Sequence, residues 1–95
     1  GVGLEPQRLA QEAAILSDKS DITEEVQRLA IHSKEVGALL DKGGEGGKKL
    51  DFLVQELRRE VNTISSKTND VEVTNNTIEM KHEIEKIKEQ IQNLQ

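Results

Sequence analysis

Residues 48–66 read KKLDFLVQELRREVNTISS. Six apolar residues in this stretch recur at spacings of one, three or four. Plotted at 100° per residue, as in an α-helix, they fall within about 100° of one another. This pattern predicts a helix from Lys48 to Ser66 with one apolar face. The face consists of Leu50, Leu53, Val54, Leu57, Val61 and Ile64.

The sequence before this helix predicts a helical hairpin over residues 6–41. Pro6 suits the first turn of a helix, and Leu9, Ala13 and Leu16 continue that helix as a short apolar face. A break is expected at residues 18–20. Asp21-Ile22-Thr23-Glu24 has the form of a capping box, in which the Asp21 carboxylate accepts the amide hydrogen of Glu24. The second helix of the hairpin should bury Ile22, Val26, Leu29, Val36 and Leu40.

Two predicted loops separate the remaining helices. They are a glycine loop over residues 42–47 and a polar break at residues 67–70. Beyond the break, apolar residues repeat at four and three over residues 71–95, which predicts a last helix with a narrow seam. The seam comprises Val73, Thr77, Met80, Ile84, Ile87, Ile91 and Leu94. It either covers the preceding helix of the same chain, which we favour, or pairs two chains in a parallel dimer. Residues 1–95 are thus predicted to be a single all-α domain of antiparallel helical hairpins, a bundle of three to four helices.

The composition narrows the functional classes. The chain has 95 residues, one aromatic residue, Phe52, no cysteine and a formal charge of −5. Disulfides and cysteine-based zinc sites are therefore excluded, and an acidic chain is disfavoured as an unaided binder of polyanions. Its apolar runs are too short for a membrane span and its first residues do not resemble a signal peptide. We expect a cytoplasmic protein with no membrane partner.

Acidic residues follow the outer faces of the predicted helix 48–66. Glu56 and Glu60 lie one turn apart and repel each other unless a cation intervenes. Hard divalent ions prefer oxygen ligands, so this pair indicates a metal site that could act on a phosphodiester. The alternative, which spacing alone favours, is a solvated face with ordinary ion pairs.

Two other groups of residues are candidates for chemistry. Glu25, Arg28 and His32 share one helix face and should meet the acidic face of helix 48–66 if the two helices pack as a hairpin. His32 suits general acid–base catalysis or metal binding, whereas we expect His82 to be solvated. Lys48 and Lys49 follow the glycine loop and suit phosphate binding at a helix start. A plain hairpin turn is the simpler interpretation of that loop.

Much of the chain resembles a known family. The run from Gly47 to Lys67 resembles the G-[RK]-[RK]-L-D-F-x-x-Q-E-x-x-R-E-x-N-T-x-x-S-K signature of the YicC/YloC family, and residues 21–32 are similar to its D-x-x-E-E-x-x-R-L-x-x-H. Residues 72–75, 78–81 and 89–94 also resemble the family pattern. Three positions depart from it, namely Arg58 in place of Asn, Ser65 in place of Gly and Gln95 in place of Glu.

The resemblance implies the C-terminal helical domain of a metal-dependent, oligomeric endoribonuclease that cleaves RNA in the bacterial cytoplasm. It implies Mn²⁺ or Mg²⁺ as cofactor, and as partners RNA, further copies of the chain and an N-terminal domain that is missing here. The isolated chain is then expected to be inactive. Carried over to this sequence, the catalytic residues are His32, Glu25, Glu56 and Glu60, the RNA-binding residues are Arg28, Lys48, Lys49 and Arg59, and the metal ligands are Glu56, Glu60 and Asp51.

Two non-catalytic functions remain open. The first is a helical oligomerisation domain of the same family, in which the polar faces form interhelical salt bridges. A weaker alternative is a helical adaptor that presents residues 81–95 to another protein.

Overall fold

The computed structural model describes residues 5–17, 19–43 and 47–94, and over these residues the chain is all-α without strands. Its helices are α1 (Glu5–Ile15), α2 (Thr23–Asp41), α3 (Gly47–Lys67) and α4 (Val71–Leu94), with a 3₁₀ turn, η1 (Ser20–Ile22), ahead of α2. This confirms the predicted fold class. The helix boundaries differ from the predicted ones by only one or two residues.

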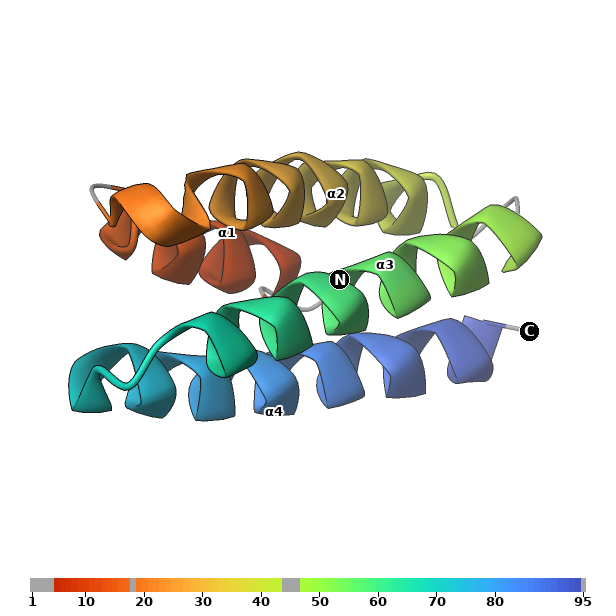
Figure 1. Ribbon diagram of the computed structural model, residues 1–95. Helices are drawn as coiled ribbons and strands as arrows, with labels where there is room; N and C mark the ends of the chain where they lie inside the picture. Colours follow the sequence, from red (N-terminus) through yellow and green to blue (C-terminus); the bar gives the residue numbers. More distant parts are fainter. Residues whose placement is uncertain (1–4, 18, 44–46, 95) are drawn as a thin grey trace.

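The four helices pack as a bundle in which each helix contacts two neighbours. α2 lies against α1 and α3, and α4 lies against α3 and α1. In Figure 1, α2, α3 and α4 are arranged from top to bottom, and α1 lies behind them. Gln90 Nε2 donates a hydrogen bond to Glu5 Oε2 at 2.9 Å, so the start of α1 lies beside the last turns of α4. The bundle is elongated, with extents of 38 × 19 × 18 Å.

The predicted apolar faces form one core. Nineteen buried apolar residues belong to a single cluster drawn from α1, α2, α3, α4 and the segment between α1 and α2. The apolar residues of the α4 seam belong to this cluster, apart from Leu94, which is half exposed, and Thr77 of the seam is also buried. The burial of the seam confirms that it covers helices of the same chain. It leaves no apolar seam on α4 for the alternative parallel dimer.

The predicted capping box does not form. Ile22, rather than Asp21, occupies the N-cap position of α2, and the Ile22 side chain makes no capping hydrogen bond. Residues 20–22 instead form η1, which buries Ile22 at 1% exposure. The physical reason is that burying a whole isoleucine side chain is worth about 1.5–3 kcal/mol, more than a typical N-cap hydrogen bond.

The polar break between α3 and α4 contains a helix cap that the periodicity did not reveal. Asp70 Oδ1 accepts hydrogen bonds from the backbone N–H groups of Glu72 at 2.9 Å and Val73 at 3.3 Å. These bonds hold the pKa of Asp70 below its ordinary value. Val71–Val73 therefore forms the first turn of α4, as predicted.

Between α2 and α3, Gly43 follows the end of α2 and has φ +82°, a conformation that favours glycine.

Some predictions concern residues outside the described part of the chain, namely the first four residues, Asp18, Gly44, Gly46 and Gln95. Among the described residues, no helix combines the length and the apolar character that a membrane span requires.

Candidate functional site

An ionic network joins α2 to α3. Arg28 Nε lies 2.7 Å from Glu60 Oε2, and Lys67 Nζ lies 2.7 Å from Glu25 Oε2. The Arg28 guanidinium also lies 3.7 Å from the carboxylates of Glu24 and Glu25 on its own helix. Glu25 and Glu60 are each only 5% exposed. Arg28 thus meets the acidic face of α3 through Glu60, whereas Glu25 meets the basic Lys67 at the end of that helix.

The network shifts the pKa values of two of its members, Glu25 and Arg28. The hydrogen bond from Lys67 is the largest of the effects that lower the pKa of Glu25. The hydrogen bond to Glu60 raises the pKa of Arg28. Buried carboxylates are tolerated when cations pair with them, so Glu25 and Glu60 are held as partners of basic residues on the neighbouring helix. This geometry favours a role in helix packing for both carboxylates.

The network predicts how stability depends on pH. Because the pKa of Glu25 is lowered by folding, its stabilising contribution is present above the ordinary glutamate pKa and is lost as the pH falls through the folded-state value. Lys67→Met removes the main cause of the lowered pKa of Glu25. It should reduce the free energy of unfolding by about 1 kcal/mol at pH 7. We therefore expect its free energy of unfolding to change less than that of the parent chain between pH 7 and pH 3, measured by urea denaturation.

Lys34→Met is a matched control, since it removes the same charge from an exposed position on α2 with no ion pair to another described residue. It should keep the parent pH dependence. A Lys67→Met variant that lost stability in acid as steeply as the parent would contradict the assignment.

The three predicted metal ligands on α3 do not converge. Glu60 already accepts a hydrogen bond from Arg28 at 2.7 Å. Asp51 is exposed and lines a groove between α3 and α4, on the opposite side of α3 from α2. Among the described residues, these carboxylates do not form a group whose oxygens lie within 4.8 Å of one another. Glu56, Glu60 and Asp51 therefore do not fit a shared metal ion, and we derive no catalytic step from a metal on α3.

His32 lies on the face of α2 that packs against α3. Arg28 pairs with Glu60 on one side of it, and Glu35 lies 3.9 Å from Lys49 on the other side. Since α2 and α3 are antiparallel, this register places His32 opposite the turns of α3 that carry Glu56. The His32 side chain is 21% exposed, and its Nδ1 lies 3.7 Å from Glu35 Oε1, beyond hydrogen-bonding distance.

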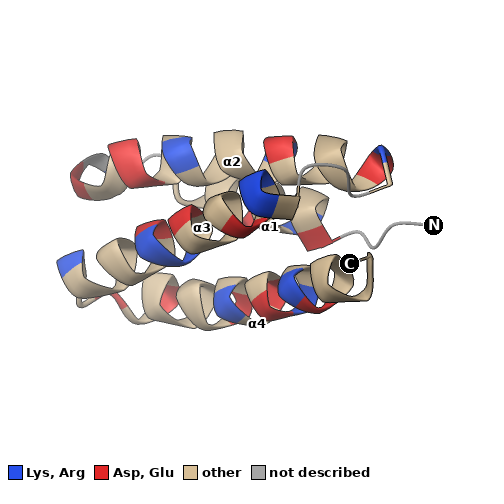
Figure 2. Ribbon diagram, turned by 90° about the vertical axis from the view of Figure 1, so that its right-hand side faces the viewer, with Lys and Arg blue, Asp and Glu red and all other residues tan. Residues whose placement is uncertain are grey.

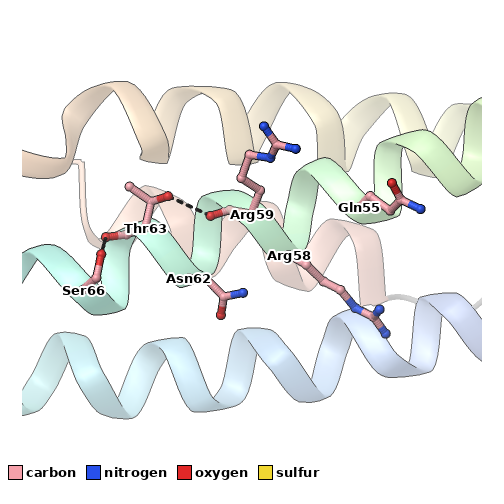
Figure 3. Close-up of a pocket in the computed structure, with 6 residues that line it drawn as sticks. All are labelled: Gln55, Arg58, Arg59, Asn62, Thr63 and Ser66. Carbon is pink, nitrogen blue, oxygen red and sulfur yellow. Dashed lines mark hydrogen bonds between the residues drawn. The ribbon is translucent and has the colours of Figure 1, made fainter.

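Polar side chains line a shallow groove of about 470 Å³ on the outer side of α3. Figure 3 shows Arg59 turned away from α4 and Arg58 turned toward it. Arg58 forms an ion pair with Glu85 of α4. Arg59 is exposed and forms no ion pair with any other described residue. The lining residues are Gln55, Arg58, Arg59, Asn62, Thr63 and Ser66.

The basic residues do not form one continuous surface. Figure 2 shows positions of lysine and arginine interspersed with positions of acidic residues along the helices. Lys48 is exposed at the start of α3 and forms no ion pair within the described part of the chain. The basic side chains on α3 that have no ion-pair partner among the described residues are therefore well separated. Lys48 lies in the first turn of α3 and Arg59 lies near its middle.

One acidic cluster was missed by the sequence analysis. Glu12 of α1 and Glu79 and Glu83 of α4 offer carboxylate oxygens that all lie within 4.8 Å of one another. Glu79 and Glu83 are four residues apart and so share a helix face, which the sequence does reveal. The contact between α1 and α4 that adds Glu12 is not visible in the sequence.

Comparison with known proteins decides the family. The chain matches the family described as Endoribonuclease YicC-like, C-terminal, over residues 2–95. The chain belongs to this family. This match confirms the resemblance that the motif from Gly47 to Lys67 indicated.

Two curated relatives extend the comparison. A protein from Clostridioides difficile (strain 630) named "Probable endoribonuclease YicC" is 49% identical over 92 residues, which cover 97% of this chain and 31% of the relative. A protein of the same name from Haemophilus influenzae (strain ATCC 51907 / DSM 11121 / KW20 / Rd) is 47% identical over 94 residues, covering 99% of this chain and 33% of the relative. The YicC-like domain thus spans about a third of the length of these relatives.

Proposed function

We propose that this chain supplies an RNA-contacting face and a proton-transfer residue to an endoribonuclease of YicC type, within a longer protein. The family match and the relatives' names support the reaction class. The observation that carries the assignment of the face is the groove on α3, in which the Arg59 guanidinium is exposed and unpaired among the described residues. The protein would act in the cytoplasm, where cellular RNA is found.

Arg59 is assigned to phosphate. Guanidinium groups bind phosphate through paired N–H donors, and the neighbouring Gln55 and Asn62 can bond to sugar or phosphate oxygens. Lys48 and Lys49 lie in the first turn of α3, where the helix dipole also favours an anion. Lys49 forms an ion pair with Glu35. Lys48 and Arg59 are therefore the principal phosphate contacts in this proposal.

His32 is assigned to proton transfer, with Glu56 as the acidic residue facing it across the α2–α3 contact. In RNA cleavage such a histidine would take the proton of the attacking hydroxyl or give one to the departing oxygen. Glu25, Glu60 and Arg28, which the family resemblance places in the same site, are assigned to the ionic network that aligns α2 with α3. They would then act on the site by holding His32 in place.

Replacing Arg59 by glutamine in the full-length protein tests the phosphate assignment. We expect RNA affinity to fall several-fold for all sequences tested, and the slope of log affinity against log salt to fall by about one, because one phosphate contact is lost. Filter binding at several salt concentrations measures both. Lys86→Gln removes the same charge from an exposed site on α4 and should change neither. Equal effects of the two substitutions would show that Arg59 contributes only through net charge.

A second candidate function is assembly. Among the described residues, six large apolar side chains are exposed at 48% or more, and such side chains on a chain that spans a third of its relatives suit contact with further domains or copies. They are Ile15, Ile31, Phe52, Val71, Ile78 and Leu94. Sedimentation of the chain at high concentration distinguishes the two functions, since a strictly monomeric chain would count against self-assembly through these residues.

A further inference from the structure

The glutamate cluster formed by Glu12, Glu79 and Glu83 lies between α1 and α4, on different helices from His32 and Arg59. One carboxylate oxygen from each residue lies within 4.8 Å of the other two. Glu12 is half-buried, Glu79 is exposed and Glu83 is only 3% exposed. The cluster therefore reaches from the surface into the contact between the two helices.

Two oxygens of the cluster have no hydrogen-bond partner although they are enclosed by the protein. They are Glu12 Oε1 and Glu83 Oε2. A buried carboxylate oxygen without a donor costs free energy, usually more than the burial of a neutral group. Oε2 of Glu83, a residue of the cluster, is thus a buried acceptor without a hydrogen-bond donor, which is an observation separate from the grouping of the acids.

The local charge is not balanced by protein groups. Within 4 Å of the three carboxylates, the one cationic group among the described residues is Arg8, whose Nη1 lies 3.7 Å from Glu83 Oε1. Arg8 is itself 54% exposed. Three carboxylates and one guanidinium leave two negative charges, which one divalent cation would neutralise. Burial and the charges of Glu83 and Glu79 raise the pKa of Glu12 to about 7, in keeping with this excess of negative charge.

We propose that Glu12, Glu79 and Glu83 bind a hard divalent cation, of the class of Ca²⁺, Mn²⁺ and Mg²⁺, which links α1 to α4. Such ions prefer carboxylate oxygens and complete their coordination with water. Two ligands on opposite sides of Ca²⁺, each about 2.3–2.6 Å from the ion, lie about 5 Å apart. One ion can therefore contact all three oxygens with small side-chain rotations. The exposed Glu79 side leaves room for water and a path for entry.

This site differs in place and in role from the metal site expected on α3. It joins two helices that are far apart in the sequence, and none of its members belongs to the α2–α3 ionic network or to the α3 groove. It does not depend on the proposed RNA chemistry, and its test requires no RNA.

The test is binding of Ca²⁺, Mn²⁺ and Mg²⁺, each added alone to the 95-residue chain at pH 8, above the pKa of Glu12. We expect calorimetric titration with at least one ion to give one saturable site per chain, and the same ion to raise Tm in a saturable manner. Glu79→Gln should weaken that binding at least about tenfold, because it removes one ligand oxygen at an exposed position. Glu12→Gln should have a similar effect.

Glu89→Gln is the matched control, since it makes the same charge change at an exposed position on α4 with no ion pair to a described residue. It should bind the cation as the parent does. Three outcomes would overturn the proposal. They are the lack of saturable binding of any of the three ions at millimolar concentration, equal affinities of Glu79→Gln and Glu89→Gln, and a chain that gains stability as the pH falls below about 7 while none of the ions changes Tm. The last outcome would mean that the glutamates share a proton instead.

Discussion

Replacing His32 by alanine in the full-length protein is expected to lower the rate of RNA cleavage by about 10²–10⁴-fold, the usual contribution of a general acid or base. The register of α2 and α3 places His32 opposite the turns that carry Glu56, between the Arg28–Glu60 and Lys49–Glu35 pairs. His32 is also 21% exposed, so a reacting group can approach it. Because His32 is assigned to proton transfer and not to phosphate binding, kcat should fall while the affinity for RNA stays near that of the parent.

The matched control is His82→Ala, which removes the other histidine of the chain from an exposed position on α4. It should leave cleavage unchanged. Thermal unfolding of both variants separates a chemical defect from a folding defect, since neither histidine belongs to the apolar core. If the His32→Ala protein, folded as the parent is, cleaved RNA at the parent rate, proton transfer by this chain would have to be abandoned.

The second large effect is expected in the core. Leu57 is fully buried in the middle of α3. Leu57→Ala should lower the free energy of unfolding by about 3 kcal/mol, because a buried leucine loses both its transfer free energy and its packing contacts. In a domain of this size the corresponding fall in Tm is roughly 10–20 °C. Urea denaturation should show a lower midpoint with an unchanged slope.

Phe52→Ala provides the contrast, since it removes a larger side chain from the same helix at a position that is 55% exposed. Its effect on the unfolding free energy of the chain should stay within about 0.5 kcal/mol. Comparable losses for the two variants would mean that Phe52 packs against other groups in solution and that the division into core and surface on α3 is wrong.

The fold was predictable because apolar periodicity determines both where a helix runs and which face it buries. The faces of α2, α3 and α4 were predicted from spacings alone, and the predicted residues are buried except for Leu94 at the end of α4. The capping box at Asp21 failed because a local hydrogen-bond pattern competes with burial of the adjacent Ile22. The cap at Asp70 was missed although its signal, an aspartate directly before Val71, is present in the sequence.

The candidate site was less predictable because it depends on the register between helices. Spacing showed that Glu25, Arg28 and His32 share a face, but it did not show which carboxylate each cation would meet. Once Arg28 pairs with Glu60 and Lys67 with Glu25, these acids have partners of their own. The glutamate cluster was missed for a related reason, since Glu12 and Glu83 meet only when the first helix packs against the last.

The pairs between α2 and α3 also restrict how the molecule can rearrange. Sliding α3 along α2 by one helical turn, about 5.4 Å, would separate Lys49 from Glu35, Arg28 from Glu60 and Lys67 from Glu25 in a single step. Such one-turn displacements occur in proteins that switch between packed states, and this hairpin is poorly suited to them. A rearrangement on ligand binding would preserve the α2–α3 hairpin as a rigid body and displace α4, which Arg58 and Glu85 join to α3 through an ion pair more exposed than Arg28–Glu60 and Lys67–Glu25.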